Sequence, residues 1–156
     1  MKQQIENNCI FCKIIMGEIP AVKIWEDERH VAVLDIKPNT EGMTLVITKN
    51  HYDSDIFEMG TKEYNSLLEA TKKVVKLLER GLKVKRVAMV VEGMEINHVH
   101  VKLYPLHGLD EKFKEMIAHE KKYFNKYEGY ITTLEGPLRT REELEKVAEK
   151  IRRNIK

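Results

Sequence analysis

The clearest periodic pattern in the chain lies between Thr61 and Leu82. Apolar side chains recur there mainly at intervals of three and four residues, with lysine and glutamate between them. That spacing places the apolar side chains on one side of a helix. We therefore predict an amphipathic helix over 61–82, with Gly81 close to its end. A shorter apolar face over residues 9–16, followed by a glycine and a proline, predicts a brief helix near the N-terminus.

Five shorter runs are rich in β-branched and other apolar residues, which is typical of strands. They are Val22–Trp25, His30–Leu34, Met43–Ile47, Arg86–Val91 and the segment 97–107. The first three follow one another closely and predict an antiparallel meander. The last two are joined by a short turn around Gly93, so we expect them to pair antiparallel as well.

The C-terminal part of the chain is predicted to add helices. Asp110 can cap a helix that carries Phe113, Met116, Ile117 and Phe124, and Thr140 with Glu143 has the form of a capping box. The terminal helix would bury the stripe Leu144, Val147, Ala148, Ile151 and Ile155. At 156 residues the chain fits a single domain over 1–156, with a core over 9–106 and a helical extension over 107–156.

Charge and hydropathy narrow the class of protein. The chain has 27 basic and 25 acidic residues, a net charge of +2, so it lacks the excess of positive charge expected of a nucleic-acid-binding surface. No apolar run approaches the ~20 residues of a membrane span, and the N-terminus has no apolar signal core. We expect neither nucleic acid nor a membrane as partner, and a cytoplasmic location.

Three of the six histidines lie within residues 97–107, around the sequence His-Val-His-Val. In a strand, side chains alternate between the two faces, so His98, His100 and Lys102 would share one face and apolar residues the other. Two imidazoles and an ammonium group suit a metal, a phosphate or nucleophilic attack. A surface strand with a solvated polar face would show the same pattern.

The two cysteines, Cys9 and Cys12, form a Cys-x-x-Cys sequence. This spacing is compatible with a redox pair, with half of a metal site, or with two buried thiols. A redox pair normally sits between a strand and a helix of a βαβ unit, whereas antiparallel strands are predicted to follow here. We therefore favour a metal site, whose other ligands should be histidines.

Three stretches, taken in order, resemble the histidine triad (HIT) family of nucleotide hydrolases and transferases. They are Cys9 to Pro20, Leu34 to His51, and Gly93 through the His-Val-His-Val strand. The resemblance covers about residues 9–106. It implies an α+β fold with a five-stranded antiparallel sheet and flanking helices, usually as a homodimer, and a purine nucleotide as ligand.

The resemblance also implies roles for individual residues. His100 matches the nucleophile that attacks the α-phosphate of a phosphoramidate or a dinucleoside polyphosphate and forms a nucleotidyl-histidine intermediate. Asp35 matches the acceptor for the ribose hydroxyls, although an aspartate that begins the turn before Pro38 would look the same. The apolar walls around the base match Phe11, Ile14, Val33 and Ile36, which could equally be ordinary core residues.

Some members of the family with Cys-x-x-Cys bind a structural zinc ion. By this resemblance its ligands would be Cys9, Cys12, His51 and His98, a Cys2His2 set of the kind that a structural Zn²⁺ prefers. The alternative is a pair of buried thiols and two unconnected histidines.

The chain departs from the family pattern at three points. Lys102 replaces the third histidine, where it could supply positive charge to the phosphate or simply be a solvated lysine at an edge. Met43 replaces a histidine, and Met94-Glu95 replaces a Gln-Ser pair, so Glu95 would repel a polyphosphate leaving group. We therefore keep two alternatives to a hydrolase: a regulatory nucleotide-binding protein with little turnover, and a Cys-x-x-Cys redox protein.

Overall fold

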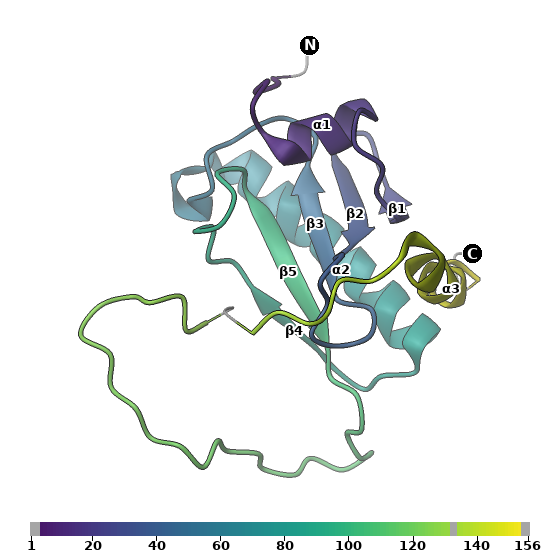
Figure 1. Ribbon diagram of the computed structural model, residues 1–156, viewed down its shortest axis with the longest axis vertical. Coiled ribbons are helices and arrows are strands. Elements are labelled where there is room, and N and C mark those ends of the chain that lie inside the picture. The colour runs from purple at the N-terminus through teal and green to yellow at the C-terminus, as the bar shows by residue number, and fades with distance from the viewer. Residues whose placement is uncertain (1–3, 132–133, 154–156) are drawn as a thin grey trace.

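The computed structural model describes residues 4–131 and 134–153 and shows an α+β fold (Figure 1). Its elements in chain order are α1 (Ile10–Met16), β1 (Lys23–Glu26), β2 (His30–Leu34), β3 (Thr44–Thr48), the 3₁₀ helix η1 (Ile56–Glu58), α2 (Thr61–Leu82), β4 (Val87–Val90), β5 (His100–Pro105) and α3 (Arg141–Arg152). The helix predicted over 61–82 is confirmed at both ends, and the first four predicted strands are confirmed within one residue of their bounds.

The five strands form one antiparallel sheet in the order β1-β2-β3-β5-β4. The predicted meander is β1-β2-β3, and the predicted final hairpin is β4-β5. The hairpin joins the meander through β5, which pairs with β3 on its other side. The last strand begins only at His100, so His98 lies just before β5 and not within it.

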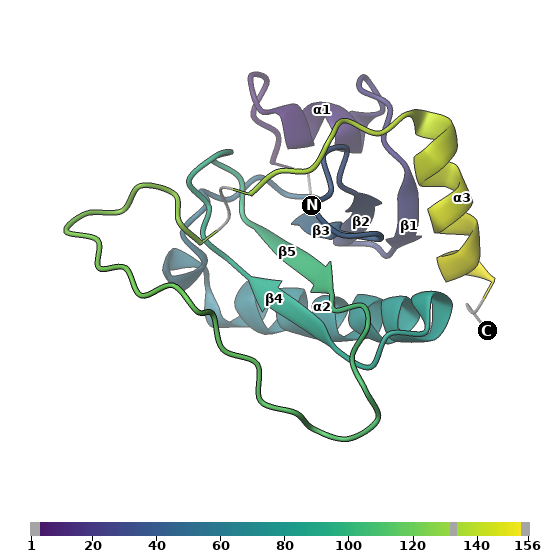
Figure 2. The same cartoon turned by 60° about the horizontal axis from the view of Figure 1, so that its bottom comes forward.

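Because side chains alternate between the two faces of the sheet, the strands contribute to two separate hydrophobic cores. On one face, strand residues such as Val46, Val101 and Leu103 pack against α2, where Leu67 and Leu78 are fully buried. On the other face, Val31, Val33 and Ile47 pack with Phe11 and Cys12 of α1. His100 and Lys102 are paired in register with Ile47 and Leu45, so they lie on the α1 face. Figure 2 shows the sheet between the two helices.

The C-terminal helix α3 joins the α2 core. Its predicted capping box is present, with Thr140 accepting from the Glu143 backbone N–H and Glu143 accepting from that of Thr140. The predicted stripe is buried through Leu144, Ala148 and Ile151, while Ile155 lies outside the described residues. Helix α3 packs on α2 and β1 (Figure 2).

The helix predicted to follow Asp110 is not formed. Phe113, Met116 and Ile117 lie in a long irregular segment and are 72–84% exposed (Figure 1). The prediction was wrong because helical spacing alone does not stabilise a short helix: most of its stability comes from packing an apolar face, and no core surface faces this segment.

Within residues 4–131 and 134–153, no helix has both the length and the apolar character that a membrane span requires.

Candidate functional site

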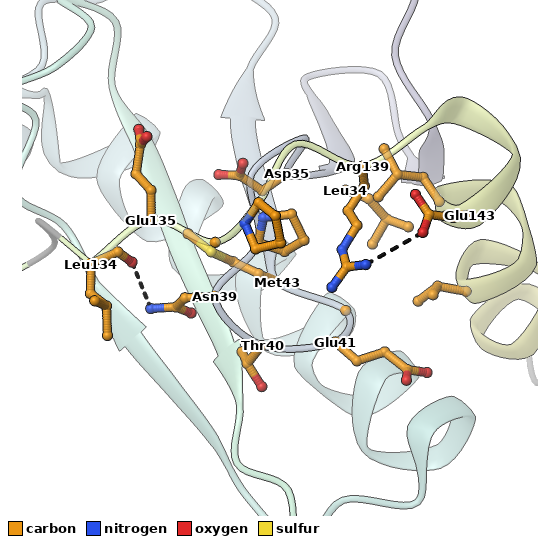
Figure 3. Close-up of a pocket in the computed structure, with 16 residues that line it drawn as sticks. Leu34, Asp35, Asn39, Thr40, Glu41, Met43, Leu134, Glu135, Arg139 and Glu143 are labelled. Carbon is orange, nitrogen blue, oxygen red and sulfur yellow. Dashed lines mark hydrogen bonds and ion pairs between the residues drawn. The ribbon is translucent and has the colours of Figure 1, made fainter.

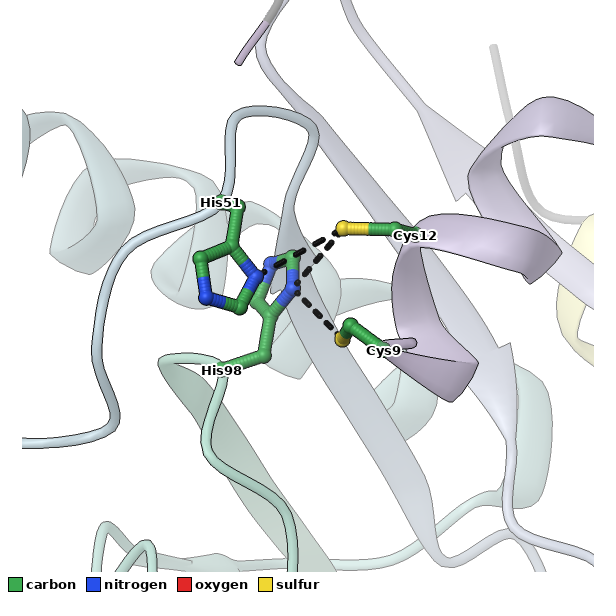
Figure 4. Close-up of side chains that lie close together, drawn as sticks. All are labelled: Cys9, Cys12, His51 and His98. Carbon is green, nitrogen blue, oxygen red and sulfur yellow. Dashed lines mark hydrogen bonds between the residues drawn. The ribbon is translucent and has the colours of Figure 1, made fainter. Parts of the chain in front are cut away.

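Four side chains meet at the N-terminal end of α1. Cys9 and Cys12 come from the start of that helix, His51 from the turn after β3, and His98 from the segment leading into β5 (Figure 4). Their ligand atoms all lie within 4.8 Å of one another. The sulfur-to-Nδ1 distances are 3.4 Å for Cys9 with His98, 3.7 Å for Cys12 with His98, and 3.5 Å for Cys12 with His51. The structure thus brings together the four residues predicted as metal ligands.

These distances fit tetrahedral binding of one ion. With Zn–S bonds of about 2.3 Å and Zn–N bonds of about 2.0 Å, the sulfur and nitrogen atoms of a tetrahedron lie about 3.5 Å apart. His98 is also prepared as a ligand. Its Nε2–H donates to the Thr48 carbonyl oxygen at 2.8 Å, which leaves the lone pair of Nδ1 directed at the cysteines.

Burial disfavours the charged forms of two members of this cluster, His98 and Cys12. It lowers the pKa of His98 to about 4, and it raises the pKa of the Cys12 thiol above its ordinary value. A neutral imidazole is the form that binds a metal. A divalent cation would also stabilise the thiolate form of Cys12, which has no positively charged group close to it among the described residues. The donor set and its surroundings therefore suit a metal ion.

The ring of His100 packs edge to face on Phe11, with 4.9 Å between the ring centroids, and Phe11 also contacts His98 of the Cys2His2 cluster in the same way. The Nδ1–H of His100 donates to the His98 carbonyl oxygen at 2.7 Å. Burial is the main cause that lowers the pKa of His100, so the ring is neutral near pH 7. In this tautomer Nε2 carries no proton and is free to act as a nucleophile.

His100 lines a cavity of about 240 Å³ between α1 and the α1 face of the sheet. Asp35, Lys102 and all four residues predicted as walls of the base site line the same cavity: Phe11, Ile14, Val33 and Ile36. The predicted reactive, charged and apolar groups therefore share one cavity. Its wall is mostly apolar, with a few polar groups, as is usual for sites that bind small molecules.

Lys102 is not a solvated lysine at an edge. Strand β5 lies inside the sheet, and the residue is only 7% exposed, with its Nζ 3.5 Å from a carboxylate oxygen of Glu95. The alternative interpretation was wrong because the strand order places β4 outside β5. A buried ammonium group is therefore available to a phosphate within the cavity.

One carboxylate oxygen of Asp35 stabilises the turn, and the other can accept a hydrogen bond from a ligand. Its Oδ1 accepts from the backbone N–H of Lys37 at 2.8 Å, as expected for an aspartate that begins a turn. Its other oxygen has no hydrogen-bond partner in the described part of the chain. Burial raises the pKa of this carboxyl group above its ordinary value, which is consistent with the scarcity of donors around it.

Of the residues that depart from the family pattern, the buried Met43 and the exposed Glu95 line the cavity, whereas the exposed Met94 does not. Sequence reasoning missed Tyr104, although the alternation that linked His100 to Lys102 continues to it. Burial raises the pKa of Tyr104 to about 12.

Sequence reasoning also missed Leu134 and Glu135, which line the cavity although they lie far along the chain from its other lining residues. These two residues and Asp35 also border a second cavity, of about 490 Å³, which His100 and Lys102 do not reach (Figure 3).

Comparison with known proteins gives the family. The HIT domain matches residues 16–108. An uncharacterised HIT-like protein of Methanocaldococcus jannaschii is 43% identical over 101 residues, covering 62% of this chain and 78% of the relative. The adenosine 5′-monophosphoramidase of Schizosaccharomyces pombe is 34% identical over 99 residues, covering 63% and 74%.

Solved structures agree with the fold. A hypothetical histidine triad nucleotide-binding protein from Sulfolobus tokodaii has a TM-score of 0.72 at 25% identity, covering 93% of this chain and 90% of that protein. A Zn-bound histidine triad family protein from Mycobacterium smegmatis has a TM-score of 0.63 at 21% identity, with 94% of each chain covered. With the domain match extending over more than half of its length, this chain belongs to the HIT family.

Proposed function

We propose that this protein is a nucleotidyl hydrolase or transferase that acts on the α-phosphate of a purine nucleotide substrate. The observation that carries the proposal is the position of His100: a buried imidazole whose Nδ1 lies 2.7 Å from a backbone carbonyl oxygen, in a cavity that Lys102 and Asp35 also line. The adenosine 5′-monophosphoramidase among the relatives supports the reaction class.

In the proposed reaction, Nε2 of His100 attacks the α-phosphorus, and the bond from phosphorus to the leaving group breaks. The leaving group departs with the electron pair and takes up a proton. Water then attacks the nucleotidyl-histidine, which releases the nucleoside monophosphate and restores the imidazole. The ammonium group of Lys102 stabilises charge on the phosphate oxygens, and the free oxygen of Asp35 accepts from a sugar hydroxyl.

Glu95 is the residue that distinguishes the two candidate substrates, a phosphoramidate and a dinucleoside polyphosphate. Its carboxylate lies beside Lys102 at the cavity and is largely exposed, and we infer that it borders the path of the leaving group. A polyphosphate leaving group carries several negative charges and would be repelled there, whereas an amine would not. We therefore favour a nucleoside phosphoramidate as substrate.

The test is release of AMP from adenosine 5′-phosphoramidate. The parent protein should release AMP, and His100→Ala should abolish the release. His119→Ala, at an exposed histidine that does not line the cavity, is the matched control and should retain full activity. AMP release by His100→Ala at the parent rate would refute the assignment.

The second candidate is a nucleotide-binding regulatory protein with little turnover. It is favoured by the replacement of two potential phosphate donors, since Met43 offers no hydrogen bond and Lys102 is already paired with Glu95. This alternative predicts micromolar binding of AMP without any nucleotidyl-histidine. Mass spectrometry of the protein quenched at alkaline pH during turnover would separate the two, because only the hydrolase gains the mass of a nucleotidyl group.

We further propose that Cys9, Cys12, His51 and His98 hold a structural Zn²⁺. The donor set supports it, because two thiolates and two imidazoles in a tetrahedral arrangement are typical ligands of zinc. The ion would tie α1, which walls the cavity, to β3 and β5. Thiolate ligands persist in a reducing compartment, which supports a cytoplasmic location.

A homodimer is our remaining proposal. Strand β4 is at the edge of the sheet and exposes Met89, so it could pair with a second copy. Light scattering would decide the number of chains in solution.

A further inference from the structure

Residues 134–139, which we call the strap, lie across the loop 35–39 before α3 begins. The backbone N–H of Gly136 donates to the Lys37 carbonyl at 3.1 Å, and that of Arg139 donates to the Ile36 carbonyl at 2.8 Å. The amide of Asn39 donates to the Leu134 carbonyl at 3.0 Å (Figure 3). The strap lies outside residues 16–108, the part matched by the HIT domain.

The strap is seated closely on this loop. A Cβ atom at Gly136 would lie 1.9 Å from the carbonyl oxygen of Pro38, so no other residue fits there without moving the backbone. At its C-terminal end the strap continues directly into the capping box of α3, and α3 is anchored in the core. The hydrogen bonds to loop 35–39 and the anchored helix after it therefore both contribute to holding the strap on the loop.

In this position the strap completes one wall of the cavity that contains His100. Leu134 and Glu135 line that cavity together with Asp35. The carboxylate of Glu135 makes an ion pair of 2.9 Å with Lys37. Burial is the main cause that raises the pKa of Asp35, and the negative charges of Glu95 and then Glu135 add to it. Figure 3 shows both carboxylates on the same side of the strap.

Carboxylates can only accept hydrogen bonds. Lys37 supplies one donor to each of these two, its ammonium group to Glu135 and its backbone N–H to Asp35, and each carboxylate can accept a further hydrogen bond from a ligand. A vicinal diol supplies two hydroxyl donors on adjacent carbon atoms. In a nucleotide the diol is that of the ribose, and Asp35 is already the proposed acceptor for one of its hydroxyls.

We propose that Glu135 is a second sugar-binding residue, whose carboxylate accepts a hydrogen bond from one ribose hydroxyl while Asp35 accepts from the other. The inference rests on the proposed nucleotide-binding function and adds to it a determinant of specificity. The strap thereby makes the site selective for ribonucleotides over 2′- or 3′-deoxynucleotides.

The test is calorimetric binding of AMP, 2′-deoxy-AMP and 3′-deoxy-AMP to the full-length protein. The parent should prefer AMP to at least one of the deoxynucleotides. Glu135→Ala should weaken AMP binding about three- to tenfold, the loss of one hydrogen bond to a charged group that is partly exposed to solvent. It should leave binding of that deoxynucleotide unchanged. Glu142→Gln, at an exposed carboxylate of α3, is the control and should match the parent.

Lys37→Gln distinguishes a direct contact between Glu135 and the ribose from a role of Glu135 in holding the strap through its ion pair with Lys37. It removes the ion pair but keeps the acceptor, so the preference for the hydroxyl should survive. Loss of the preference in Lys37→Gln, or its retention in Glu135→Ala, would overturn the proposal. A parent protein that binds none of the three nucleotides would instead overturn the proposed function, and the role of Glu135 with it.

Discussion

We predict that Gly81→Ala lowers the free energy of unfolding, although alanine normally stabilises a helix relative to glycine. In an exposed helix interior, Gly→Ala stabilises by about 1 kcal/mol, because glycine loses more backbone freedom on folding. Here a Cβ atom would lie 2.5 Å from Cα of Ile151 and 3.0 Å from the carbonyl oxygen of Lys150. Both are backbone atoms of α3, so they cannot rotate aside and the two helices must separate.

The separation decides the sign of the effect. Overpacking of this kind costs about 1–3 kcal/mol. Separation also exposes part of the fully buried side chains of Ala148 and Ile151, at about 0.8 kcal/mol for each methylene group returned to water. After subtraction of the helix-propensity gain, we expect Gly81→Ala to lower the free energy of unfolding by about 1–2 kcal/mol.

Urea unfolding of the zinc-saturated protein, followed by circular dichroism, would measure this change. Asn65→Ala, at an exposed position of the same helix, is the control for helix propensity and should stabilise by a few tenths of a kcal/mol. If Gly81→Ala raised the free energy of unfolding as Asn65→Ala does, α3 would not pack on α2 as closely as described.

Three further predictions follow from the site and the core. Protein purified without a histidine tag should contain about one zinc per chain, and Cys12→Ser should lose it together with several kcal/mol of unfolding free energy, because metal binding contributes directly to folding; metal analysis showing equal zinc in both would contradict this. Burial lowers the pKa of His30, partly opposed by Asp27, so below its ordinary pKa the unfolded state binds more protons and the free energy of unfolding falls with falling pH. The buried His100, whose pKa is also lowered, contributes to the same dependence, so His30→Asn should reduce the slope in urea titrations between pH 6.5 and 5, and an unchanged slope would show that His30 does not contribute. Glu95→Gln should raise kcat/KM for diadenosine tetraphosphate relative to adenosine 5′-phosphoramidate, and a ratio equal to the parent's would show that Glu95 does not select the leaving group.

Local patterns in the sequence determined most of the secondary structure. The 3.6-residue period over 61–82 predicted α2 at its observed ends, and the capping box at Thr140 predicted the start of α3. Both signals arise within a few residues of chain, so they are readable without knowledge of the fold. The same reasoning failed for residues 113–124, where the period is present but the packing surface is absent.

The metal cluster could also be predicted from the sequence. Its four candidate ligands are of two residue types, cysteine and histidine. The Cys-x-x-Cys spacing and the family resemblance identify them without knowledge of the fold. Alternation in the last strand placed His100 and Lys102 on one face, and the structure brings both to one cavity. The tautomer of His100 depends on a carbonyl group two residues away, which no residue pattern reveals.

Only the tertiary structure decided the environment of Lys102 and the position of the strap. Lys102 is buried because the order of the strands places β4 outside β5. Glu135 reaches Lys37 across 98 positions of the chain, through backbone hydrogen bonds that have no side-chain signature. A periodic pattern reports which face of an element is buried, whereas the identity of what covers that face is set by contacts between distant segments. For this protein, the sequence by itself determined the strands, three of the predicted helices and the main reactive groups, and the folded chain decided which of those groups share one cavity.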